Sequence, residues 1–160
     1  MRYITDVEIR SDRMYRFALA PAALWRQLLR VEDYPSWWPW VRRFDANALA
    51  SGDVWRCTIQ PPLPYALRCS LQLGAVIAPK LIEADVSGDL SGWARLEFRE
   101  VAEPDQPAAT DVRLVAVLAA ASAPVRIASR LFPRLAHWGH DWVLDTAARQ
   151  FATAAALDPL

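Results

Sequence analysis

Apolar and polar residues alternate through most of the middle of the chain, as they do in strands with one buried face. Trp55, Cys57 and Ile59 fall on one side of such a strand, whereas Arg56 and Thr58 fall on the other. Turn residues and prolines separate the alternating segments. The pattern predicts seven strands, at residues 7–19, 44–50, 54–60, 66–76, 80–87, 93–101 and 110–121. Short strands at hairpin spacing favour an antiparallel meander.

Segments with helical spacing flank this meander. The predicted helices are at residues 21–31, 124–131 and 133–157, with a short helical turn in the proline-rich segment 33–41. Pro21 and Pro133 suit the first turns of their helices because a first turn needs no bond from the missing N–H. Apolar residues occupy most of the circumference of the last helix. We therefore predict that this helix is covered on most sides.

The order of these elements is one strand, two short helices, six strands and a long helix. It predicts an α+β fold in one domain over residues 1–160, in which a curved seven-stranded antiparallel sheet wraps around the C-terminal helix. A flat, narrow sheet could not bury so wide an apolar arc. Because a curved sheet and a helix do not fit each other completely, we expect an apolar pocket between them.

Composition narrows the classes of partner. The 18 basic and 18 acidic residues cancel, and the arginines are scattered, so we expect no nucleic-acid partner and no attraction to an anionic membrane. No apolar run approaches the roughly 18 residues of a membrane span, so we expect no membrane insertion. Met1–Arg10 carries no apolar signal core, and two cysteines fit reduced thiols. We expect a cytoplasmic protein, either a monomer or a weak homodimer.

Several segments carry a resemblance to a known family. Ala23–Trp25 and Val31–Pro39, with the sequence VEDYPSWWP, resemble the early helix pair of START-like proteins, and more narrowly the polyketide cyclase/dehydrase and lipid-transport (SRPBCC) group. The Gly88–Gly92 turn and His140-Asp141 are similar to bacterial members. The resemblance implies a helix-grip fold with a deep pocket for a hydrophobic molecule. Members include lipid carriers, hormone and quinone binders, aromatase/cyclases and chaperone co-factors.

Strand parity and helix position predict which residues line the pocket. Thr146 and Gln150 are polar among apolar neighbours, and a buried polar group needs a partner. Each of them either orients a ligand or bonds to a neighbouring strand or water. For the apolar residues the alternative is an ordinary core contact. The predicted ligand-binding set is Trp38, Trp55, Cys57, Ile59, Leu67, Cys69, Leu71, Ala84, Val86, Leu96, Phe98, Leu114, Trp142, Thr146 and Gln150.

Reactive side chains form no catalytic or metal set in the sequence. His137, His140 and Asp141 share one side of the last helix, but the helical zinc pattern of two histidines four residues apart with a glutamate between them is lacking. Cys57 and Cys69 face each other if their strands pair in register, and no histidine on those strands could activate a thiol. No residue matches a catalytic residue of the cyclases. We therefore predict no metal, no cofactor and no catalytic residue.

Trp37, Trp38 and Trp40 surround Pro39. We consider three roles for these tryptophans: they gate the pocket, they form an exposed contact patch, or they plug the open end of the sheet. Three functions stay open: a non-enzymatic carrier or sensor of a small hydrophobic ligand, aromatic or lipid-like; a polyketide aromatase/cyclase-like enzyme; and an interaction module that uses the tryptophans. A dry apolar pocket favours the carrier, which is our first hypothesis. Polar residues turned inward favour the enzyme, Arg68 above all if strand parity slips at a bulge.

Overall fold

The computed structural model of the protein describes residues 8–157. Its elements follow the order that the alternation predicts. In chain order they are β1 (Glu8–Phe17), α1 (Pro21–Leu28), the 3₁₀ turn η1 (Val31–Asp33), α2 (Tyr34–Trp37), β2 (Val41–Asp45), β3 (Val54–Ile59), β4 (Leu67–Ile77), β5 (Leu81–Gly88), β6 (Leu90–Val101), β7 (Ala109–Ala120), α3 (Ala123–Leu131) and α4 (Pro133–Leu157).

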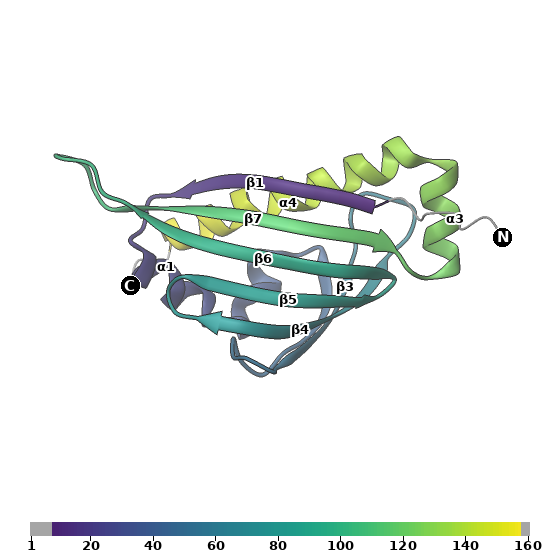
Figure 1. Ribbon diagram of the computed structural model, residues 1–160, viewed down its shortest axis with the longest axis horizontal. Helices are drawn as coiled ribbons and strands as arrows, with labels where there is room; N and C mark the ends of the chain where they lie inside the picture. The colour runs from purple at the N-terminus through teal and green to yellow at the C-terminus, as the bar shows by residue number, and fades with distance from the viewer. Residues whose placement is uncertain (1–7, 158–160) are drawn as a thin grey trace.

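The seven strands form one antiparallel sheet in the order β1-β7-β6-β5-β4-β3-β2. The first strand therefore pairs with the last, and β2 to β7 form the predicted meander. Figure 1 shows α4 running behind β1 and β7, with α1 near one end of the sheet and α3 at the other. The curved sheet around a long C-terminal helix confirms the predicted fold class.

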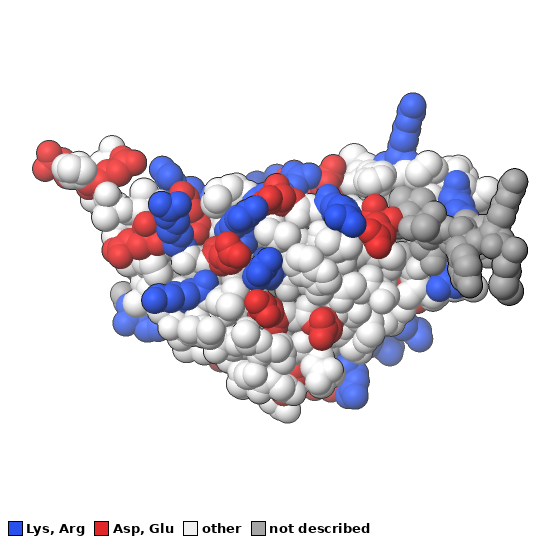
Figure 2. Space-filling model, viewed as in Figure 1, with Lys and Arg blue, Asp and Glu red and all other residues white. Residues whose placement is uncertain are grey.

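The predicted alternation places apolar side chains on the concave face, which is turned toward α4. Trp55 and Cys57 on β3, Leu73 on β4, Ala84 on β5 and Phe98 on β6 are all buried. Figure 2 shows basic and acidic side chains interspersed over the outer face. Because exposed ion pairs contribute little to stability, the concave face carries most of the energy that holds the sheet to the helix.

Cys57 and Cys69 lie directly opposite each other on β3 and β4, as strand parity predicts. Both are free and buried. Burial raises the pKa of Cys57 to about 11 and that of Cys69 to about 12. Both groups therefore stay protonated at neutral pH and pack as small apolar side chains.

The second strand is predicted too far along the chain: β2 spans Val41–Asp45 and not residues 44–50. The following residues form a loop around one carboxylate, because Asn47 and Ala48 donate their backbone N–H groups to Asp53 Oδ2 at 3.2 and 3.0 Å. The Trp55 indole also donates to the Ala48 carbonyl, at 3.0 Å. These bonds satisfy the backbone of the loop without a neighbouring strand.

α4 has the predicted bounds, but its surroundings change along its length. Thr146, Phe151 and Ala155 are all buried. By contrast, Leu135 is 36% exposed and Trp138 is 48% exposed. The prediction that the helix is covered on most sides is therefore wrong for its first turns, which meet α3 at the end of the molecule (Figure 1). Among the described helices, none is long and apolar enough to cross a membrane.

The tryptophan-rich segment folds into an aromatic corner made of Tyr34, Trp37, Trp38, Phe44 and Trp55. The Tyr34 ring lies at the centre, 5.0 to 5.7 Å from the other four rings. The Trp38 indole donates to the Ala147 carbonyl of α4 at 3.0 Å. Of the three alternatives for this segment, these contacts favour a plug at one end of the sheet.

Candidate functional site

Two cavities lie between the concave face of the sheet and α4. The histidine cavity, of about 160 Å³, is bounded by α3, the first turns of α4, the loop at residues 61–65 and the adjoining strand ends. The aromatic cavity, of about 220 Å³, is bounded by α1, Trp38, the middle of β6 and β7 and the later turns of α4. Leu144 lines both cavities, so its side chain stands at the boundary between them.

The aromatic cavity offers almost purely apolar walls. Of the thirteen residues that line it, only Tyr15 and Trp38 carry polar side-chain atoms. The Tyr15 hydroxyl donates to Asp145 Oδ1 at 3.0 Å, and the Trp38 indole is bonded to Ala147. Burial, reinforced by the bond to Asp145, raises the pKa of Tyr15 to about 12, so its hydroxyl is neutral. These walls can contact an apolar molecule, and none of the thirteen residues is placed for acid–base chemistry.

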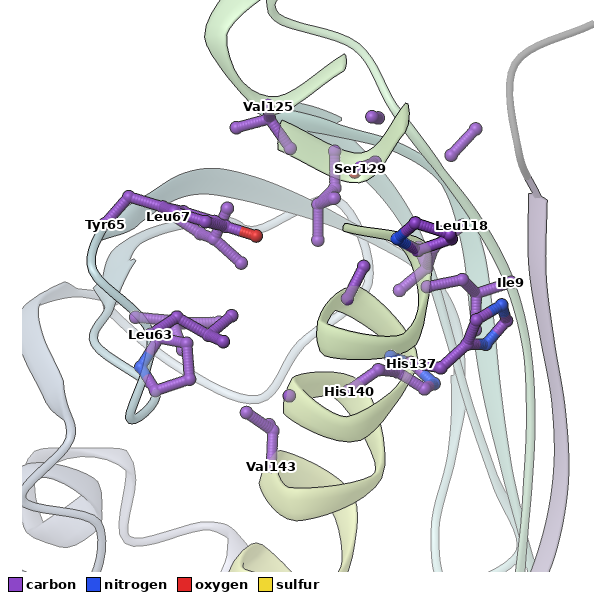
Figure 3. A pocket seen from close by; sticks show the side chains of 18 of the residues that line it. Ile9, Leu63, Tyr65, Leu67, Leu118, Val125, Ser129, His137, His140 and Val143 are labelled. Atoms are coloured by element: carbon purple, nitrogen blue, oxygen red, sulfur yellow. The ribbon is translucent and has the colours of Figure 1, made fainter. Parts of the chain in front are cut away.

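The histidine cavity has a mixed wall, which Figure 3 shows from close by. The side chains that converge on it come from the loop, from α3, from α4 and from the sheet: Leu63, Tyr65, Val125, Ser129, His137, His140, Val143, Ile9 and Leu118. The loop comes close to α4 at Gly139, where a Cβ atom would lie only 2.7 Å from Leu63 Cδ1. The glycine therefore permits this loop to cover the cavity.

His140 brings a titratable group to the cavity wall. Its Nε2 lies 2.5 Å from Ser11 Oγ, which is buried on the concave face of β1. Burial is the main cause that lowers the pKa of His140, with the charges of Arg13 and His137 adding to the effect and Asp141 opposing it. The ring is therefore neutral near pH 7, with one nitrogen as donor and the other as acceptor. Such a group can orient a ligand hydroxyl or carbonyl, or transfer a proton.

Charged side chains outside the cavity fix α4 against β1. Arg13 donates to Asp141 and, at 3.2 Å, to Asp145, which also accepts from Tyr15. Arg13 is about one-third exposed and both carboxylates are about half exposed. We expect this network to set the register of the helix more than the overall stability, because exposed ion pairs are weak. That register places His140 opposite Ser11.

The fifteen residues predicted to bind a ligand fall into groups by position. Those on the walls of the aromatic cavity are Trp38, Leu96, Phe98 and Leu114. Those on the walls of the histidine cavity are Ile59 and Leu67. Those buried in the core without lining either cavity are Trp55, Cys57, Cys69 and Ala84. Thr146 is likewise buried and lines neither cavity, and the four half-buried residues that also lie outside both walls are Leu71, Val86, Trp142 and Gln150. For all fifteen, contact with a ligand stays a prediction.

The two polar helix residues have protein partners. Gln150 Oε1 accepts a hydrogen bond from the Trp40 indole at 2.8 Å. Thr146 is buried, and its Oγ1 lies 3.5 Å from a guanidinium nitrogen of Arg149. Neither partner lies on a strand, because Trp40 is in the turn before β2 and Arg149 is on α4 itself. A role for either group in orienting a ligand stays a prediction.

Sequence reasoning missed the face of α4 that lines the cavities. Ala136, His140, Leu144 and Ala148 recur at intervals of four, a spacing that puts them on one side of a helix. The helix residues chosen instead, such as Trp142, lie two positions further along and therefore about 200° around the axis. The signal was present in the spacing, but most sides of this helix look apolar in sequence.

Metal-binding side chains are not gathered in the part of the chain that the structure describes, where no group of three or more His, Cys, Asp or Glu could hold a metal ion. His140 faces Ser11 and Asp141 accepts from Arg13. The two residues therefore have separate roles in the contact between β1 and α4.

No family model matches the sequence, and no curated protein does. Solved structures match over nearly the whole chain. The Zhui aromatase/cyclase from a Streptomyces species has a TM-score of 0.66 at 10% identity, over 96% of this chain and 98% of that one. Ara h 8.0201 has a TM-score of 0.64 at 10% identity, over 95% and 100%. A truncated norcoclaurine synthase from Thalictrum flavum has a TM-score of 0.61 at 10% identity, over 97% and 98%. The chain thus has the helix-grip fold of START-like proteins, as its sequence resemblance implies.

Proposed function

We propose that the protein binds a small, largely apolar molecule between its sheet and α4, as a carrier or sensor. The observation that supports this most is the aromatic cavity, about 220 Å³ of space whose few polar lining groups are already bonded within the protein. A ligand gains there from leaving water, at about 25 cal/mol for each Å² of apolar surface buried. It meets no charged side chain on the lining, which favours a neutral or weakly polar molecule.

The size of the cavities limits the ligand. An apolar cavity of roughly 150 Å³ binds benzene or xenon, so the histidine cavity has room for about one six-membered ring and the larger aromatic cavity for about two fused rings. Drug-sized ligands occupy roughly 300–1,000 Å³. A ligand of three rings would therefore need both cavities, with the Leu144 side chain displaced from the boundary between them.

A second candidate function is an acid–base enzyme of the aromatase/cyclase kind. It is favoured by His140, a neutral imidazole on an otherwise mostly apolar wall with Ser11 as its partner. Two of the solved structures with this fold are named as enzymes. Arg68 does not add to this candidate, because it is exposed on the outer face of β4, opposite Thr58.

Ala148→Leu tests the proposed binding because it fills the aromatic cavity from α4. We expect the affinity for 2-naphthol, measured by isothermal titration calorimetry, to fall at least tenfold. The free energy of unfolding should hold or rise by about 0.5–2 kcal/mol, since filling a cavity stabilises. Ala152→Leu, one turn further on and exposed, is the matched control and should bind like the wild type. Equal binding by both variants, or a wild type that binds neither naphthalene nor 2-naphthol, would contradict the proposal.

His140→Gln separates the two candidates. A carrier retains naphthalene binding in this variant and returns every ligand chemically unchanged, as mass spectrometry of the recovered ligand would show. An enzyme of the second kind converts a short linear poly-β-ketone to an aromatic product faster than the uncatalysed reaction, and loses most of that rate in the variant.

A further inference from the structure

The corner between α3 and α4 exposes an apolar patch. Of the ten large apolar side chains that are exposed in the described part of the chain, five lie within residues 127–138. They form the α3–α4 patch: Ile127 (58% exposed), Leu131 (67%), Phe132 (59%), Leu135 (36%) and Trp138 (48%). Single exposed apolar residues are ordinary on protein surfaces, whereas a group of five on adjoining helices indicates a contact surface.

Basic residues are interleaved with this patch. Arg126, Arg130 and Arg134 follow one another at intervals of four along the same helices, and residues 112–140 contain no Asp or Glu. The neutral charge of the whole chain thus conceals a locally basic segment. Figure 2 shows basic side chains projecting at this end of the molecule.

We propose that the α3–α4 patch docks on an anionic membrane surface. Large apolar side chains, including a tryptophan, interleaved with arginines are the composition of helices that lie in the interface between lipid headgroups and acyl chains. The apolar side chains would enter the interface while the guanidinium groups meet lipid phosphates. This docking is peripheral. It departs from the expectation, drawn from the balanced charge of the whole chain, that the protein is not attracted to an anionic membrane.

A second copy of the chain suits the patch less well. A two-fold contact through the α3–α4 patch would bring the arginines of one copy close to those of the other, and like charges at an interface are unfavourable. The corner also projects at one end of the molecule (Figure 1). A projecting apolar corner can enter a lipid interface directly, whereas a protein partner would need a matching hollow.

The same helices form a wall of the histidine cavity. Val125 and Ser129 on α3, and Pro133 and Ala136 on α4, line it. Docking would therefore hold this cavity beside the lipid interface. The docking itself stands on the patch and its charges, independently of the proposed ligand binding.

Vesicle flotation tests the docking on the full chain. We expect the wild type to bind vesicles of phosphatidylglycerol and phosphatidylcholine at least tenfold more strongly than vesicles of phosphatidylcholine alone, and to lose this preference at high salt. Leu131→Ser combined with Ile127→Ser should lower binding at least tenfold, because both side chains lose their apolar burial. Arg134→Gln should lower it about fivefold. Ile77→Ser, at a site 52% exposed at the end of β4, is the matched control and should bind like the wild type.

Circular dichroism on each variant shows whether the fold is kept, and 2-naphthol binding reports on the cavities separately. A wild type that ignores anionic vesicles overturns the docking even where 2-naphthol binds. Equal vesicle binding by the Ile127/Leu131 variant and the Ile77 control overturns it as well. So does a dimer in analytical ultracentrifugation that the Leu131→Ser change dissociates, because the patch would then be a contact between copies.

Discussion

The two cavities share the side chain of Leu144, yet they are closed by different means. The aromatic corner closes one end of the aromatic cavity with stiff rings that contact α4 through Phe151 and through the bond of Trp38 to Ala147. The histidine cavity is closed by a proline-rich loop and by α3, and it has a titratable ring on its wall. The comparison shows that the aromatic cavity, which is closed by stiff rings, is suited only to apolar contact. The end covered by the loop and α3 brings a titratable ring to the cavity wall and therefore allows polar chemistry.

The largest expected change in the free energy of unfolding lies at the aromatic corner. Phe151→Ala should lower the free energy of unfolding by about 3–5 kcal/mol, measured by urea denaturation, because the ring is 5% exposed. It lies 5.4 Å from the Phe17 ring and 5.3 Å from the Trp37 ring. Phe132→Ala, at a site 59% exposed, is the control and should stay within about 0.5 kcal/mol of the wild type. Similar losses in the two variants would show that the aromatic corner does not hold α4.

A smaller effect is expected at the boundary between the cavities. Leu144→Ala should cost about 2 kcal/mol, at the lower end of the range for buried leucines, because this side chain is half-buried and borders both cavities. The variant should join the cavities and bind 2-phenylnaphthalene more tightly than the wild type does. Leu73→Ala, at a site on β4 that is 2% exposed and lines neither cavity, should cost more and give no such gain. Unchanged size selectivity in Leu144→Ala would break the idea of a single boundary.

The smallest effect concerns the titratable end. Burial holds the pKa of His140 below its ordinary value of 6.5, so the unfolded chain binds this proton more readily than the folded one. The free energy of unfolding should therefore fall as pH drops below about 6.5. Above that pH, the stability that depends on a neutral His140 should be fully present. His140→Gln should flatten this part of the pH profile. A profile identical to the wild type would mean that the ring is not buried in solution.

Much of the fold could be predicted from the sequence because each face of each strand has its own composition. The alternation in Trp55, Cys57 and Ile59 fixed the inward face, and the same parity places Cys57 opposite Cys69. Residues 46–50 misled the prediction of β2. The backbone N–H groups of Asn47 and Ala48 bond to the carboxylate of Asp53 in the following turn, a contact that the alternation of apolar and polar residues does not reveal.

The site was less predictable, for two physical reasons. First, which side of α4 meets the sheet depends on its rotation, and a helix that is apolar on most sides does not encode that rotation in its pattern. Secondly, a lined cavity and a filled core use the same residue types. Trp55 and Phe98 look alike in sequence, yet only Phe98 borders empty space.

A crystal structure under xenon pressure tests most directly whether two dry cavities lie on either side of Leu144. Apolar cavities of this size bind xenon because they exclude water. We predict one xenon site in the histidine cavity and another in the aromatic cavity, with the Leu144 side chain between them. Side chains that fill both spaces, or chains of ordered water in place of xenon, would contradict the account.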